Sequence, residues 1–145
     1  MTVATRRVMT LASLDAAAVA VAVAASYALR FDGMVPPPYA TQVPWVAAAF
    51  VVVRIGLLAA LGLYSRVWAY ASLPEVFSIA AATVTGTLGL WVLNVFYRPF
   101  VVPRSVFVIE WLLSTAAIGG IRILLRLRAN WIKARASETD THRSE

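Results

Sequence analysis

Residues 44–63 read PWVAAAFVVVRIGLLAALGL, an apolar run whose only charged residue is Arg54. An α-helix rises about 1.5 Å per residue, so a run of this length spans about 30 Å, the thickness of the hydrocarbon core of a bilayer. An arginine at that depth costs several kcal/mol unless it is paired or reaches water. The stretch therefore predicts a transmembrane helix packed in a bundle whose interior holds a polar partner for Arg54.

Three further runs of similar length and composition occupy residues 8–29, 74–96 and 103–124. A proline stands near the start of three of the four runs, where a helix does not need its N–H group. These prolines are Pro44, Pro74 and Pro103. With 61% hydrophobic residues and a mean hydropathy of +0.76, the chain is too apolar for an ordinary soluble domain. We therefore predict an all-α fold, an integral membrane four-helix bundle over residues 1–126, followed by a basic juxtamembrane segment and disordered cytoplasmic tail over residues 127–145.

The basic residues outside the four runs are divided unevenly between the two sides of the bundle. On the side of the termini lie Arg6, Arg7, Arg66, Arg126, Arg128, Lys133, Arg135 and Arg143, and on the other side lie Arg30, Arg98 and Arg104. The positive-inside rule therefore predicts that both termini are cytoplasmic in a multi-pass protein of the inner (plasma) membrane. Because the net charge of +6 comes from residues that flank apolar runs, we expect a lipid bilayer as partner and no nucleic acid.

The first run has a second interpretation. Arg6-Arg7 followed by an alanine-rich stretch resembles a secretory or twin-arginine signal peptide, with small residues at positions 24–26 as a cleavage site. The run is long for the hydrophobic region of a signal peptide, and it carries Asp15 in its first half. We therefore favour a retained transmembrane helix.

Three charged residues lie at membrane depth: Asp15, Arg54 and Glu110. Counted from the inner end of each run, Asp15 lies about 10 Å and Arg54 about 14 Å below the inner surface. An arginine side chain can bridge that difference, whereas Glu110 lies about 7 Å higher than Arg54. We therefore predict an ion pair between Asp15 and Arg54, with Glu110 protonated or facing Thr87 or Asn94.

These charges allow two interpretations. They can form a polar pathway for a proton, an ion or a sugar-phosphate, or they can fix which helices pack together. We favour the second, because three charges are few for a transport route and no second acid lies one turn away. Small residues three or four apart, Ala16, Ala20 and Ala24 in the first run and Gly86 and Gly89 in the third, also predict close helix packing, with self-association as the alternative.

No residue pattern for catalysis or cofactor binding occurs in the chain. There is no cysteine, the single histidine is His142 in the polar tail, and no Gly-x-Gly-x-x-Gly turn is present. Lys133 has no tyrosine four residues before it. We therefore expect no catalytic residues, no cofactor and no metal.

The segment between the second and third runs combines aromatic and basic residues. Tyr64, Trp68 and Tyr70 lie close to Arg66 at the inner interface, where aromatic rings favour the headgroup level and arginine can meet lipid phosphate. We interpret this cluster as an interfacial anchor, with recognition of a polyprenyl-phosphate or a nucleotide-sugar phosphate as the alternative. Further juxtamembrane basic residues on this side are Arg122, Arg126 and Arg128.

The same segment, GLYSRVWAYASLPE at residues 62–75, resembles a cytoplasmic loop in the N-terminal membrane region of bacterial nucleotide-sugar epimerases and 4,6-dehydratases of polysaccharide biosynthesis. Three other segments agree in order: LRFD at residues 29–32, PRSV at residues 103–106, and GGIR at residues 119–122 followed by Arg126. The family usually has arginine where this chain has Ser65 and Ala69, so the loop is less basic here.

The resemblance implies a function without catalysis by this chain. In that family a nucleotide-binding catalytic domain follows the membrane region, whereas this sequence ends at Glu145. We therefore expect a cell-envelope membrane module that anchors or assists a separately encoded glycan-biosynthesis enzyme at the cytoplasmic face, or a shortened gene product. The alternative is a small four-helix translocase of lipid-linked sugars that uses Arg54 as its phosphate contact. An assembly scaffold without a ligand is a third possibility.

Overall fold

The computed structural model of the chain describes residues 3–64, 73–98 and 100–141. In these residues the secondary structure is entirely helical, and the helices are α1 (Val3–Arg30), α2 (Pro37–Ala40), α3 (Val43–Ala60), α4 (Leu73–Tyr97) and α5 (Arg104–Thr141). Four segments are long and apolar enough to cross a bilayer, namely Thr5–Arg30, Pro37–Ala60, Phe77–Tyr97 and Arg104–Ile132. The predicted all-α fold with four transmembrane helices is thus confirmed.

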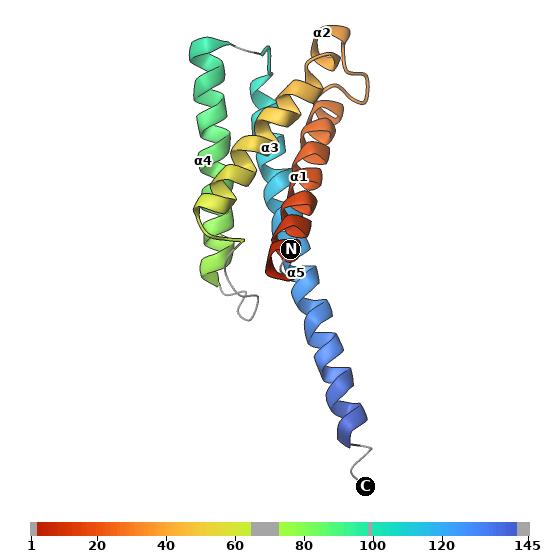
Figure 1. Cartoon of the computed structure of the whole chain (residues 1–145). Coiled ribbons are helices and arrows are strands. Elements are labelled where there is room, and N and C mark those ends of the chain that lie inside the picture. Colours follow the sequence, from red (N-terminus) through yellow and green to blue (C-terminus); the bar gives the residue numbers. More distant parts are fainter. Residues whose placement is uncertain (1–2, 65–72, 99, 142–145) are drawn as a thin grey trace.

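The four long helices form an up-and-down bundle (Figure 1). α1 packs against α3 and α5, and α4 packs against the same two helices, so α3 and α5 face each other across a diagonal of the bundle. Both chain ends lie toward the same end of the bundle, below which α5 continues as a single helix (Figure 1). We call this the terminal end and the opposite one the loop end.

The connections follow from local backbone chemistry. At the end of α1, Asp32 and Gly33 adopt φ angles of 52° and 86°, and the Gly33 N–H donates to the Ala28 carbonyl over 2.8 Å. At the end of α3, Gly62 adopts a φ of 69°, and the following Leu63 N–H donates to the Leu58 carbonyl over 3.0 Å. Glycine adopts this left-handed conformation without a steric cost, and it ends helices in this way. The turn at Gly62 brings the chain back toward the bundle, where Leu63 is buried.

At the loop end, two connections are tied together by one side chain. The short helix α2 starts at Pro37, so the second membrane segment begins earlier than the predicted residue 44. Gln42, between α2 and α3, accepts a hydrogen bond from the Val101 N–H over 2.9 Å and donates one to the Pro38 carbonyl over 2.7 Å. This side chain therefore joins the α1–α3 connection to the α4–α5 connection.

The bundle buries polar groups inside and leaves apolar side chains on its outer surface. The buried polar residues are Asp15, Ser26, Arg54, Thr83, Thr87, Glu110, Ser114 and Arg122. The interior also contains an apolar core, which includes Val19, Val23, Phe50, Leu58 and Ile118. Large side chains such as Val52, Phe77 and Leu112 point outward. This distribution is expected of a bundle surrounded by lipid, where intramembrane charges face the interior.

The C-terminal segment differs from the predicted disordered tail. α5 continues to Thr141, and residues 142–145 lie outside the described part of the chain. The stretch beyond residue 124 contains neither proline nor glycine, and arginine and alanine are its most frequent residues. Because these residues have high helix propensity, a helix that starts in the membrane can propagate through a polar sequence.

Candidate functional site

The first polar cluster lies in the bundle centre around Arg54 of α3. Its guanidinium is almost fully buried, at 1% exposure, and Nη2 lies 2.7 Å and 2.9 Å from the two carboxylate oxygens of Glu110 on α5. Nη2 also lies within 3.1 Å of the hydroxyl oxygens of Thr87 and Ser114, and Nη1 donates to the Thr83 carbonyl. The buried positive charge is therefore neutralised by one carboxylate and surrounded by acceptors from α4 and α5.

Further polar and small residues complete this cluster. The Thr115 and Thr83 hydroxyl oxygens are 2.9 Å apart, which links α5 to α4 beside the ion pair. A Cβ atom on Gly86 would lie 3.1 Å from Leu57 Cδ1 and 3.3 Å from Arg54 Nη1. Of the two glycines expected to allow close helix packing in the third run, Gly86 lies at the contact with α3. Gly89 has nothing within 4 Å of an added Cβ atom.

The second polar cluster lies nearer the terminal end, around Asp15 of α1. Arg122 Nη2 of α5 and the Tyr64 hydroxyl both contact Asp15 Oδ2, at 3.1 Å and 2.9 Å respectively. The Arg122 guanidinium also lies 5.8 Å from the centroid of the Tyr64 ring. Burial, followed by the Asp15 carboxylate, raises the pKa of the Tyr64 hydroxyl, so this group stays protonated and donates to Asp15.

The predicted ion pair between Asp15 and Arg54 is therefore wrong. Arg54 pairs with Glu110, and Asp15 pairs with Arg122. Counting residues along a helix gives a depth but not the direction in which a side chain points, and Arg54 points across the bundle diagonal rather than toward α1. The predicted depth of Glu110 assumes that its helix reaches the inner surface at residue 124, whereas α5 continues through that position.

The other predicted site residues fall into three groups. Tyr64 donates a hydrogen bond to Asp15. Arg66, Trp68 and Tyr70, the other residues of the predicted interfacial cluster, lie outside the described residues. Arg122, which was predicted to be a juxtamembrane basic residue, is buried in the bundle in an ion pair with Asp15. The two remaining juxtamembrane residues, Arg126 and Arg128, are exposed on α5.

Sequence reasoning missed Thr83, Ser114 and Thr115 as members of the Arg54 cluster. A signal for two of them was available, because Thr83 precedes Thr87 by four residues and Ser114 follows Glu110 by four residues. Residues at this spacing share one face of a helix. Two polar pairs at the same spacing, on two helices of one bundle, mark the faces that line its centre.

An apolar groove of about 460 Å³ lies between α4 and α5. Its lining consists of Val84, Thr87, Leu88, Trp91, Arg104, Phe107, Val108 and Trp111. Thr87 separates the groove from the Arg54–Glu110 pair, to which its hydroxyl is bonded. The apolar lining suits contact with lipid chains and leaves the central ion pair covered.

Chemically, each of the two clusters is a buried ion pair with hydrogen-bonding groups around it. Each buried charge has an oppositely charged partner, and the described residues contain no group of three metal-ligating side chains. Comparisons of the chain with protein-family models, with curated proteins and with solved structures found no match. Its function is therefore inferred from the geometry of the described residues.

Proposed function

We propose that this chain is a non-catalytic membrane module of glycan biosynthesis, which anchors or assists a separately encoded nucleotide-sugar-modifying enzyme at the cytoplasmic face. The observation that carries the proposal is the extension of α5 beyond the bundle at the terminal end (Figure 1). A single helix that leaves a bundle offers a surface to a partner without disturbing the packing within the membrane.

The extension carries side chains suited to such a contact. Leu127, Trp131 and Ile132 are each more than half exposed. The Arg135 guanidinium lies 4.6 Å from the centroid of the Trp131 ring. Aromatic residues and arginine are enriched at protein interfaces, where one large side chain often contributes much of the binding energy.

The bundle interior supports an anchoring role. The Arg54–Glu110 and Asp15–Arg122 pairs join three of the four membrane-crossing helices, with Thr83 and Thr87 adding the fourth. Polar contacts of this kind specify how transmembrane helices pack. A bundle held in one arrangement positions α5 for a partner.

The alternative of a lipid-linked sugar translocase is not favoured by this geometry. It required Arg54 to bind a substrate phosphate within the bundle. The Arg54 guanidinium instead contacts the Glu110 carboxylate, two hydroxyl groups and a backbone carbonyl. A phosphate would have to displace Glu110 and would leave that carboxylate buried and unpaired, which is costly.

Site-specific photocrosslinking in native membranes tests the proposal. A photoreactive amino acid at position 131 should crosslink to a nucleotide-sugar-modifying enzyme identified by mass spectrometry, whereas the same group at position 52, on the outward face of α3, should react with lipid.

Co-purification with matched variants gives a second test. Trp131→Glu should abolish co-purification of that enzyme, and Met34→Glu, at an exposed apolar residue of the loop end, should leave it unchanged. If position 131 captures only lipid, the proposed role is wrong.

A further inference from the structure

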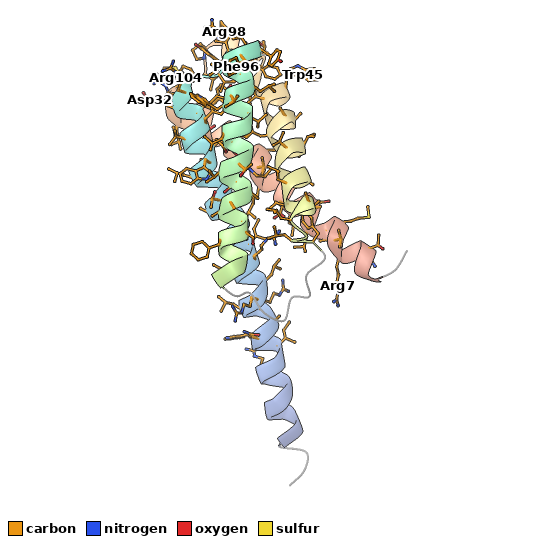
Figure 2. The ribbon with its side chains drawn as sticks, turned by 90° about the vertical axis from the view of Figure 1, so that its left-hand side faces the viewer. Arg7, Asp32, Trp45, Phe96, Arg98 and Arg104 are labelled. Carbon is orange, nitrogen blue, oxygen red and sulfur yellow. The ribbon has the colours of Figure 1, made fainter. Side chains whose placement is uncertain are left out.

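A cavity of about 590 Å³ lies at the terminal end between the start of α1 and the middle of α5. Its lining residues are Arg6, Arg7, Thr10, Leu11 and Leu14 of α1 and Leu125 and Ala129 of α5. Figure 2 shows α1 leaning away from the rest of the bundle toward its N-terminus, with Arg7 pointing toward the end of the bundle from which α5 extends. The divergence of the two helices opens the cavity.

Charge and apolar surface are separated within this cavity. Arg6 and Arg7 contribute two positive charges to its lining, whereas Leu11, Leu14 and Leu125 contribute apolar side chains. Among the described residues, neither Arg6 nor Arg7 forms an ion pair with a carboxylate. The cavity therefore offers guanidinium groups and an apolar wall to the same ligand.

The arginine and leucine residues of the cavity lie at different depths in the membrane. The first membrane-crossing segment begins at Thr5, so Arg6 and Arg7 lie at the level of the lipid headgroups. Leu11 and Leu14 follow about 6 to 12 Å deeper, at a rise of about 1.5 Å per residue. A ligand in the cavity thus meets positive charge at headgroup depth and apolar side chains at the depth of the acyl chains.

We propose that this cavity binds an anionic phospholipid of the surrounding bilayer. The lipid phosphate accepts hydrogen bonds from Arg6 and Arg7, whose planar guanidinium groups match the geometry of phosphate oxygens. One acyl chain packs against Leu11, Leu14 and Leu125. Basic pockets between transmembrane helices are suited to anionic headgroups, and the two-helix wall distinguishes this site from general attraction of the basic terminal end to a charged membrane. The site is independent of any protein partner of α5.

The full-length protein in detergent micelles can be titrated with phosphatidylglycerol and with phosphatidylcholine, and bound lipid can be counted by native mass spectrometry. We expect saturable binding of one phosphatidylglycerol, with phosphatidylcholine bound much more weakly. Arg6→Gln and Arg7→Gln should each weaken the affinity about five-fold, given the attraction of one basic side chain to anionic lipid. Arg128→Gln, which removes an exposed charge of α5 outside the cavity, should weaken it less than two-fold, about the limit of such a measurement.

A second variant keeps every charge and changes only the cavity. Ala129→Trp places a bulky ring at the exposed α5 wall and should displace the lipid, with retention of the folded bundle checked by circular dichroism. Inorganic phosphate, which has no acyl chain, should not compete. Equal effects of Arg7→Gln and Arg128→Gln, unchanged binding in folded Ala129→Trp, or displacement by inorganic phosphate would each overturn the proposal.

Discussion

Arg54 and Glu110 form an ion pair between the two helices that face each other across the bundle diagonal, with Nη2 and Oε2 2.7 Å apart. The pair closes the bundle centre, because the arginine of α3 contacts the Thr87 hydroxyl of α4 and reaches a carboxylate of α5. A charge that is buried and paired in this way is suited to holding helices together. It is poorly suited to receiving a substrate.

The pairing of Arg54 with Glu110 can be tested by a double-mutant cycle. Arg54→Leu leaves the Glu110 carboxylate buried without its partner and should destabilise the protein by about 3 to 5 kcal/mol, whereas Arg54→Leu with Glu110→Leu should cost less. Unfolding in mixed detergent micelles gives the free energy of unfolding of the single and the double variant. As a control, Asp15→Leu and Arg54→Leu affect separate clusters, and their costs should add within about 0.5 kcal/mol. Coupling between Asp15 and Arg54 instead would contradict the observed pairing.

The hydroxyl of Tyr64 should contribute to stability through Asp15. Tyr64→Phe removes a hydrogen bond to a charged group and should cost about 1.5 to 3 kcal/mol at neutral pH. Because the pKa of Tyr64 is raised in the folded protein above the value of 10.0 for an unperturbed tyrosine, this contribution is complete below pH 10 and decreases as the pH rises further. The stability difference between the wild type and Tyr64→Phe should therefore be constant from neutral pH to about pH 9 and shrink above pH 10. Tyr97→Phe, at an exposed position, should show no such difference.

The space beside Arg54 at residue 86 should not accommodate a branched side chain without a cost in stability. Gly86→Val adds atoms within 3.1 to 3.4 Å of Leu57, Arg54 and Val53 and should destabilise the bundle by about 1 to 3 kcal/mol. Gly89→Val, one turn further along α4 with open space around it, should change stability by less than about 0.5 kcal/mol. Thermal unfolding in detergent compares the two variants. Equal costs would mean that the contact between α3 and α4 does not restrict residue 86.

The distribution of basic residues predicts the orientation of the bundle. Reporter fusions after Glu145 should be active on the cytoplasmic side, and an insertion between Pro36 and Pro38 should report the opposite side. Replacing both Arg6 and Arg7 with glutamine should weaken this preference without abolishing it, since six of the eight basic residues on that side remain. A C-terminus outside the cytoplasm would overturn the assigned topology and the role proposed for α5.

The isolated chain should neither bind a nicotinamide cofactor nor convert a nucleotide-sugar. Such chemistry needs a glycine-rich turn at a helix start to hold the pyrophosphate, together with a positioned acid and base. Isothermal titration calorimetry of the purified protein with NAD should give no saturable heat, and a nucleotide-sugar epimerase or dehydratase of known activity serves as the positive control. Saturable binding would show that this chain contains a cofactor site.

The sequence by itself determined that the chain has four helices long and apolar enough to cross a membrane, although the second segment starts earlier and the fourth ends later than predicted. Bilayer thickness sets the length of an apolar run, and three of the runs carry a proline near their start, so both kinds of signal are local in the sequence. The sequence also placed Asp15, Arg54 and Glu110 at membrane depth, where a charge is costly unless it is paired or neutralised.

Only the tertiary structure decided which charges meet. Pairing depends on which helices are neighbours or diagonal in the bundle and on how they are aligned along their axes. Residue spacing along one helix shows which of its side chains share a face, but not which residues of another helix that face meets. Arg122 became the partner of Asp15, and Tyr64 joined them because the chain turns back at Gly62. In the same way, the cavity beside Arg6 and Arg7 exists because α1 and α5 diverge, which is a relationship between helices that lie at opposite ends of the sequence.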